Sequence, residues 1–244
     1  MGISKNIGNI LFVLLFVISF STPQVSYSSD RYDNTEVYDP IEGVNRSIYS
    51  FNEFLDKILL KPIAKGYRYI VPHPVRKGVH SFLGNLKEPV TLINSAFQGD
   101  VHNGFTSFWR FTVNSTFGVA GIFDVAAVAG LEKREEDFGQ TAGVYGLGPG
   151  AYLMLPILGP SNARDLFGKV VDGFTDPFNY ALHEDASLGR ALAGGVDSRE
   201  RTLDLIEEIN RTSLDPYAAI RSLYDQKRID EIKNGKVRKG AKAL

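Results

Sequence analysis

Apolar side chains recur every three or four residues along most of the chain, a spacing that predicts helices with one apolar face. The first predicted helix begins at Asp39-Pro40, because Asp39 can cap a helix and Pro40 fits the first helical turn. Its apolar stripe is made of Ile41, Val44, Ile48, Phe51, Leu55 and Ile58. Pro62 is expected to end or restart this helix, and Val71-Pro72-His73-Pro74 to form a rigid, extended connector.

Further helical periods follow this connector. A second helix is marked by Val75, Val79, Phe82, Leu83 and Leu86. Residues 89–97, 161–174 and 197–210 are also predicted to be helical, and Asp215-Pro216-Tyr217 has the form of a helix start. No five residues alternate between apolar and polar, and no β-hairpin signal is present. The pattern therefore predicts an all-α fold, with one domain at residues 38–233.

One long segment carries no charge at all. Residues 138–163 are a run of 26 residues without Asp, Glu, Lys, Arg or His, and they include six glycines and three prolines. So many helix breakers argue against a straight membrane-spanning helix. Uncharged, irregular backbone is tolerated at membrane depth only where protein surrounds it or where it lines a cavity. Tyr152–Leu155 is the candidate within it for a short strand or helical turn.

Residues 101–130 are also poor in charge, with only Arg110 and Asp124 as formal charges. The thirteen residues between these two are too few to span a bilayer, but they suit a buried or re-entrant element. A buried core helix of a soluble protein fits the same pattern equally well. Charges inside apolar segments are usually paired or face a water-filled cavity, which makes Arg110 and Asp124 candidate functional residues.

Composition excludes several classes of protein. The 244 residues carry a net charge of −1, so there is no electrostatic basis for binding nucleic acid. The absence of cysteine excludes disulfides, thiolate metal sites and thiol nucleophiles. The four histidines are scattered without zinc-ligand spacing, and the glycines at 146, 148 and 150 lack the context of a phosphate-binding loop. We therefore expect no catalytic residues, no metal site and no cofactor.

The two ends of the chain are expected to lie outside the helical domain. Residues 1–28 read as a secretory signal peptide, with Lys5, an apolar core at Ile10–Phe20, and Ser26 and Ser28 before the cleavage site. An uncleaved membrane anchor is the alternative. Residues 29–37 form a polar leader and residues 234–244 a basic tail, which is either solvated or in contact with anionic lipid headgroups. The protein is therefore expected to be exported.

A series of motifs in order between residues 38 and 230 resembles the MlaA/VacJ family. The motifs are Asp39-Pro40-x-Glu42-Gly43-x-Asn45-Arg46, Phe51-Asn52, Gly66-Tyr67-Arg68, Val71-Pro72-x-Pro74-Val75-Arg76, Asn85-Leu86-x-Glu88-Pro89, Arg110-Phe111-x-x-Asn114-Ser115-Thr116-x-Gly118, Glu136-Asp137-Phe138-Gly139-Gln140-Thr141, Leu155-Pro156-x-Leu158-Gly159-Pro160-Ser161, Arg164-Asp165 and Asp215-Pro216-Tyr217.

The resemblance implies a ring-like helical protein embedded in the periplasmic leaflet of the outer membrane around an amphipathic channel. Such a protein takes mislocalised phospholipid from the outer leaflet and passes it to a soluble periplasmic lipid carrier, which maintains lipid asymmetry. The resemblance also implies association with a trimeric outer-membrane porin, and it implies neither catalysis nor a cofactor. Because lipid would move without bond cleavage, the missing catalytic constellation agrees with this expectation.

With this resemblance, residues 138–163 are interpreted as a Gly/Pro-rich hairpin segment that borders the lipid path. Arg110 and Asp124 are expected to face a hydrated interior. The residues expected to line or gate the path are Tyr145, Tyr152, Leu155 and Leu158. Phe51 and Asn52 are expected to pack against this gating segment.

The chain departs from the family in one respect, because family members are typically lipoproteins and this chain has no cysteine to carry acyl chains. Attachment is then expected through an amphipathic surface and a porin partner, or through an uncleaved signal peptide. Mass spectrometry of the mature N-terminus separates the two, since a start at Ser29 excludes the uncleaved anchor. Two other functions compete with lipid transport. One is a structural or adaptor protein that binds porins without conducting lipid, and the other is a lipid hydrolase, for which the sequence offers no nucleophile.

Overall fold

The computed structural model describes residues 37–233, and these are mostly helical, as predicted. The first elements are α2 (Glu42–Leu55), a π-helical turn (Asp56–Leu60), α3 (Lys61–Ile70), α4 (His73–Asn85), α5 (Glu88–Phe97), α6 (Val101–Thr116) and α7 (Val125–Val128). The rest are α8 (Phe138–Val144), β1 (Tyr152–Leu155), β2 (Gly159–Asn162), α9 (Ala163–Thr175), α10 (Phe178–Ala181), α11 (Glu184–Thr212) and α12 (Pro216–Ile232). The predicted signal peptide, the polar leader up to residue 36 and the basic tail lie outside the described residues.

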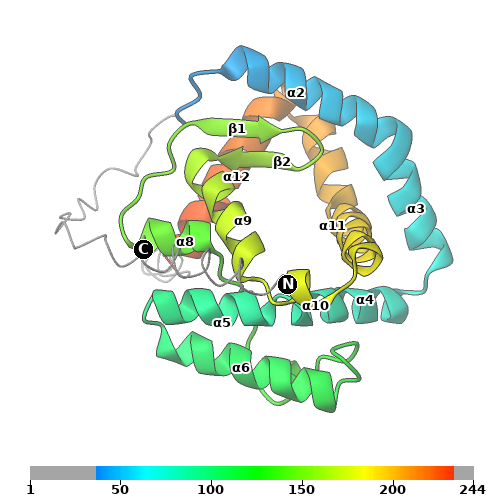
Figure 1. Cartoon of the computed structure of the whole chain (residues 1–244). Helices are drawn as coiled ribbons and strands as arrows, with labels where there is room; N and C mark the ends of the chain where they lie inside the picture. Colours follow the sequence, from blue (N-terminus) through cyan, green and yellow to red (C-terminus); the bar gives the residue numbers. More distant parts are fainter. Residues whose placement is uncertain (1–36, 234–244) are drawn as a thin grey trace, which may run out of the picture. The chain divides into compact units, whose positions relative to one another are not determined.

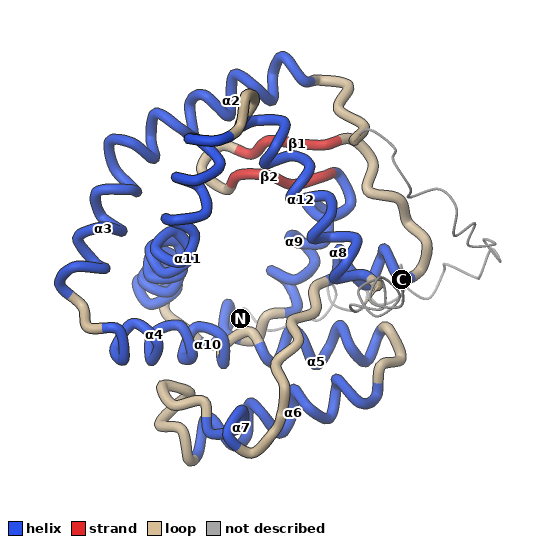
Figure 2. The backbone as a smooth tube through the Cα atoms, turned by 180° about the vertical axis from the view of Figure 1, so that it is seen from behind, coloured by secondary structure: helices blue, strands red, loops and turns tan. Residues whose placement is uncertain are grey.

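The described elements form a closed ring. Helices α2, α3, α4 and α5 follow one another along its edge (Figures 1 and 2). The circuit closes because α5 contacts α8, α8 contacts α12, α12 contacts β2, and β1 contacts α2. Helices α9 and α11 lie inside this edge in both views, and α11 packs against α3 and α4. The expected ring-like helical architecture is confirmed.

Helices α2 and α3 form one continuous, curved rod (Figure 1), so the expected break at Pro62 does not occur. Proline removes one helical hydrogen bond and its ring crowds the carbonyl one turn earlier. The π-helical turn just before Pro62 relieves this conflict, because Lys61 donates its N–H to the Asp56 carbonyl, five residues back. The rod therefore continues from Glu42 to Ile70.

Two predicted helix starts also differ from the structure. Asp39 does not cap α2, because Ile41 occupies the cap position and the Asp39 carboxylate is used elsewhere. The connector before α4 is shorter than expected, since α4 begins at His73 and only Val71 and Pro72 are left outside it. Pro74 falls in the first turn of α4, where its missing N–H has no helical partner to lose.

The low-charge segment 101–130 is a helix, a tight turn and a short second helix. Gly118 makes the turn possible, because a Cβ atom there would lie 2.2 Å from the Phe123 carbonyl oxygen. Val119 and Ala120 follow it with φ angles of 53° and 56°, a left-handed conformation that costs free energy in residues other than glycine. The turn leaves α7 close to the second half of α6.

A β-hairpin is the element that the periodicity did not predict. β1 and β2 pair antiparallel, with Tyr152 opposite Asn162 and Leu155 opposite Gly159. β1 lies at the predicted candidate strand, but β2 has the sequence Gly-Pro-Ser-Asn, which contains no residue that favours strands. The next helix begins at Ala163, two residues later than predicted, because Asn162 caps it by accepting a hydrogen bond from the Asp165 N–H.

The distribution of polar side chains is the reverse of that in an ordinary soluble domain. Among residues 37–233 the buried positions hold 23 polar or charged side chains and only eight hydrophobic ones. Large apolar side chains are instead exposed on several helices, for example Phe54 on α2, Phe105 on α6 and Leu192 on α11. Exposed apolar surface of this extent indicates contact with something other than water. No helix among these residues is both long and apolar enough to cross a bilayer.

Candidate functional site: a hairpin clamped to a curved helix

The tip of the β-hairpin is apolar, exposed and conformationally strained. Ile157 and Leu158 are 65% and 70% exposed, respectively. Ile157 has a φ angle of 67°, and Gly159 follows at 78°. A β-branched residue in this left-handed region is an outlier that persists only when surrounding contacts hold it there.

Two asparagines on α2 supply such contacts to β1 and the tip. Asn45 donates its Nδ2 to the Tyr152 carbonyl at 3.0 Å, and its Oδ1 accepts from the Met154 N–H at 2.9 Å. Asn52 repeats the pattern, since it donates to the Leu155 carbonyl at 2.9 Å and accepts from the Ile157 N–H at 2.8 Å. Each side-chain amide thus pairs with the strand as a neighbouring strand would.

The spacing of these two asparagines matches the strand. Seven helical residues advance by about 10.5 Å, and three strand residues advance by about 10 Å. Asn45 and Asn52 therefore meet backbone groups three residues apart along β1, with the same geometry at both points. The curved rod and the hairpin are held in one register, and the second asparagine fixes the strained Ile157.

An aromatic cluster packs between the hairpin and α12. Tyr152 and Met154 of β1 pack against Tyr217 of α12, with Tyr49 and Tyr224 around them. Ring centroids lie 5.8 Å apart for Tyr49 and Tyr217 and 6.1 Å apart for Tyr152 and Tyr217, both edge to face. Tyr152 is only 1% exposed, and burial raises the pKa of its hydroxyl above the usual range. The structure thus puts this predicted path-lining residue inside the cluster.

Asp39 ties α2 to α12 beside this cluster. Its carboxylate accepts hydrogen bonds from Asn45 at 2.7 Å, from Arg221 at 2.8 Å and from the Tyr217 hydroxyl. Burial alone would raise the pKa of Asp39, but these hydrogen bonds outweigh it and the pKa is lowered. Arg46 extends the contact by donating two hydrogen bonds to Asp215, the cap of α12.

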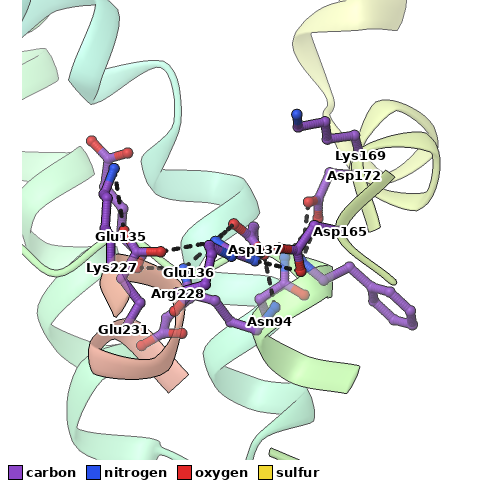
Figure 3. A network of polar contacts seen from close by, with 12 residues as sticks. Asn94, Glu135, Glu136, Asp137, Asp165, Lys169, Asp172, Lys227, Arg228 and Glu231 are labelled. Carbon is purple, nitrogen blue, oxygen red and sulfur yellow. Dashed lines mark hydrogen bonds and ion pairs between the residues drawn. The ribbon is translucent and has the colours of Figure 1, made fainter. Parts of the chain in front are cut away.

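A second polar network joins α8, α9 and α12 (Figure 3). Arg228 donates to Asp137 at 2.7 and 2.9 Å and to Asp165 at 2.8 and 3.0 Å. Asp137 also caps α8 by accepting from the Gln140 N–H. Burial raises the pKa of both carboxyl groups, but the contacts with Arg228 outweigh burial and lower it. The uncharged run is thus anchored at both ends by carboxylates that pair with the buried Arg228.

A third network holds Arg110 and Asp124, which were predicted to face a hydrated interior. Arg110 is 2% exposed and donates to Glu88 at 2.9 Å, to the Leu131 carbonyl and to both carboxylate oxygens of Asp124 at 2.9 and 3.0 Å. Asp124 also accepts from Asn114 and caps α7. The two residues are therefore paired with each other, and the pair connects α5, α6 and α7.

The other predicted residues divide between two places. Leu155 and Leu158 lie on the hairpin, and Asn52 of α2 donates a hydrogen bond to the Leu155 carbonyl. Phe51, the preceding residue of α2, is half-exposed. Tyr145 follows α8, is 70% exposed and donates its hydroxyl to the Phe97 carbonyl. Sequence reasoning gave no role to Asn45 or Arg228, and it gave Asp39 only the role of a helix cap. Asn45 and Asp39 stand in the motif that begins at Asp39, and an arginine in the apolar-striped α12 was the only signal for Arg228.

Residues 37–233 hold no group of three or more His, Cys, Asp or Glu side chains that could bind a metal ion. The clustered carboxylates accept hydrogen bonds mainly from arginines, as in the networks around Arg110 and Arg228. These groups stabilise the arrangement of the helices.

These features define a class of helical proteins with a polar, ion-paired interior, an apolar outer surface and a hairpin clamped to the ring. The chain belongs to the MlaA lipoprotein family, whose model matches residues 37–231.

Its relatives include the intermembrane phospholipid transport system lipoprotein MlaA of Escherichia coli K12, 38% identical over 88% of this chain and 86% of the relative. The protein of the same name from Haemophilus influenzae is 33% identical over 89% of this chain and 88% of the relative. An uncharacterized protein of Rickettsia bellii is 40% identical over 79% of this chain and 76% of its own length.

A solved structure also matches, from work on the structural basis for maintenance of bacterial outer membrane lipid asymmetry. It has a TM-score of 0.73 and 36% identity, and the match covers 80% of this chain and 98% of the other.

Proposed function

We propose that this chain transports phospholipid at the outer membrane without chemical change, removing it from the outer leaflet for transfer to the inner membrane. The relatives named for intermembrane phospholipid transport support this proposal. The observation that carries it is the reversed distribution of polarity, with charges buried between the helices and large apolar side chains exposed. A phospholipid has the same two requirements, an apolar surface for its acyl chains and a polar route for its headgroup.

The exposed apolar surface is proposed to sit in the periplasmic leaflet of the outer membrane. Helix α6 contributes Phe105, Phe108 and Trp109 to this surface, all at least 45% exposed. Aromatic side chains of this kind favour the boundary between headgroups and acyl chains. Such a surface would compensate for the missing cysteine, together with a trimeric porin as membrane partner. A soluble periplasmic carrier would receive the lipid.

Among the predicted path residues, those with exposed side chains are proposed to contact lipid. Tyr145 and Leu158 are each 70% exposed, and Leu155 is half-buried at the end of β1, where its carbonyl accepts a hydrogen bond from Asn52. Asn52 would hold the tip in position, with Phe51 beside it. Tyr152, Arg110 and Asp124 would act indirectly, by fixing the walls of the path.

Deletion of the gene in its host tests this function. The fraction of phospholipid exposed on the cell surface, measured with an externally added phospholipase, is expected to rise on deletion. Re-expression of the wild-type chain is expected to return this fraction to the starting level. Re-expression of Leu158→Asp is expected to leave it high, because the variant puts a charge at the apolar tip. Unchanged surface phospholipid after deletion would contradict the proposal.

A further inference from the structure

Helix α11 contains two adjacent glycines in its interior, Gly194 and Gly195. Each glycine weakens a helix about fivefold relative to alanine, because it loses more backbone freedom on folding. Close packing explains some helical glycines, such as Gly168 of α9, where a Cβ atom would lie 2.4 Å from the Gly139 backbone nitrogen. A Cβ atom at either glycine of the α11 pair would meet nothing within 4 Å. Packing therefore does not require glycine at these two positions.

The parts of α11 before and after the pair differ in burial. The N-terminal part, residues 184–193, contains no buried side chain, and Leu188 and Leu192 in it are 60% and 63% exposed. The buried residues of α11 all follow the pair, and they are Asp197, Arg199, Glu200, Leu203 and Ile209. The two glycines therefore lie at the boundary between a sparsely packed and a well packed part of one helix.

Different elements hold these two parts. Before the pair, Arg190 forms an ion pair with Asp176, and its guanidinium carbon lies 5.8 Å from the ring centre of Phe178 in α10. After the pair, Arg199 donates hydrogen bonds of 2.5 and 2.8 Å to Asp56 in the π-helical turn. Two further contacts fix this second part to α3 and α4, and they join Glu200 to Arg68 and Asp197 to His80.

We propose that Gly194 and Gly195 form a hinge, about which the N-terminal part of α11 bends together with α10 relative to α3 and α4 during lipid transport. This inference rests on the proposed transport of phospholipid and adds the element that moves. A hinge needs a few residues that absorb changes in backbone angle between two parts with separate attachments. Because α11 lies inside the edge of the ring (Figures 1 and 2), bending displaces the exposed Leu188 and Leu192 within the ring.

Hydrogen–deuterium exchange of the purified full-length chain in detergent tests whether α11 opens at the pair. The amides of residues 196–198 report this opening, because their helical hydrogen bonds reach back across the pair to the carbonyls of residues 192–194. In the double variant Gly194→Ala/Gly195→Ala these amides are expected to exchange about twentyfold more slowly. Gly189→Ala is the matched control, since a Cβ atom there also meets nothing within 4 Å. It should change exchange at residues 196–198 far less.

The phospholipase assay of surface phospholipid tests whether this bending serves transport. In a deletion strain, re-expression of the double alanine variant is expected to leave surface phospholipid high, whereas Gly189→Ala should restore the low level. Gly194→Asn/Gly195→Asn separates flexibility from space, because asparagine is larger than alanine but is a poor helix former. This variant is expected to restore the low level.

Four results would overturn the inference, and they differ in meaning. Unchanged exchange at residues 196–198 in the double alanine variant would contradict opening at the pair. Slower exchange together with normal surface phospholipid would mean that bending has no part in transport, and it would leave the proposed function intact. High surface phospholipid with the double asparagine variant would show that the glycines provide space. Unchanged surface phospholipid after deletion itself would contradict the proposed function, and with it the role of the hinge in transport.

Discussion

Buried arginines in this chain connect helices that are distant in sequence. Arg228 bridges Asp137 and Asp165, which lie 91 and 63 residues away. Arg110 does the same for Glu88 and Asp124. Each guanidinium satisfies two carboxylates with several hydrogen bonds, the condition under which buried ions are tolerated. These side chains therefore help to specify the arrangement of the helices, a role that apolar packing has in most soluble domains.

Asp172 differs from these paired carboxylates and predicts a pH dependence. Burial raises the pKa of Asp172 to about 6, although the Phe138 N–H and Asn94 donate hydrogen bonds to it. Between about pH 4 and pH 6 the folded chain keeps this proton and the unfolded chain has lost it, so the contribution of Asp172 to stability falls as pH rises. Because each pKa unit corresponds to 1.4 kcal/mol, the free energy of unfolding loses up to about 3 kcal/mol through Asp172 over this pH range.

The variant Asp172→Asn isolates this contribution, because asparagine does not titrate. Denaturant unfolding followed by the fluorescence of Trp109 gives the free energy of unfolding of both proteins at pH 4.5 and pH 7. The variant is expected to gain stability relative to the wild type as pH rises, whatever constant cost the altered hydrogen bonds bring. A difference that stays the same at both pH values, or that changes in the opposite direction, would contradict the raised pKa of Asp172.

At the scale of elements, the clamp between α2 and the hairpin predicts a local effect. Asn52→Ala removes the hydrogen bonds to the Leu155 carbonyl and the Ile157 N–H. Each contributes about 1 kcal/mol, and the strain at Ile157 favours release of the tip. The Ile157 amide is therefore expected to exchange with solvent deuterium about tenfold to a hundredfold faster.

Ser50→Ala is a suitable control for this variant. Ser50 lies on the same helix, and its hydroxyl donates only to the Arg46 carbonyl within the helix. Exchange at Ile157 should be unchanged in the control. Equal exchange in Asn52→Ala and the wild type would mean that the tip keeps its conformation without the clamp.

Periodicity predicted most helices because their apolar stripes are local in sequence. Helix α5 begins and ends close to the predicted residues, and α12 begins at the predicted start. α11 begins at Glu184, well before the predicted residue 197. Periodicity missed its first half because that half is rich in alanine and glycine and has only a weak apolar stripe. The π-helical turn also escaped prediction, since a proline alone does not indicate whether a helix ends or widens.

The hairpin and the site could be predicted only in part, because long-range contacts create them. β2 has no strand preference of its own and is held by pairing with β1, which α2 holds through Asn45 and Asn52. The sequence identified Asn52, Leu155 and Leu158 through the family motifs. It did not reveal that Arg110 and Asp124 pair with each other, because residues 14 apart come together only through the turn after α6.

For the whole molecule, the arrangement of polarity is the feature that connects fold and function. Many charges are buried between the helices, and large apolar side chains are exposed on several of them. Water alone does not favour this arrangement, but a lipid leaflet around the ring does. Under the proposed function, the ring, the clamped hairpin and the exposed tip would be parts of one path for an amphipathic molecule.

Photo-crosslinking from the hairpin tip tests this account most directly. A photoreactive amino acid replaces Leu158, which is exposed at the tip, and in a matched control it replaces Glu208, which is exposed on α11. After irradiation of intact cells, mass spectrometry of the purified chain identifies what is attached. The account predicts phospholipid adducts at position 158 and none at position 208. Only protein adducts at position 158 would contradict it and would favour a porin-binding adaptor that does not conduct lipid.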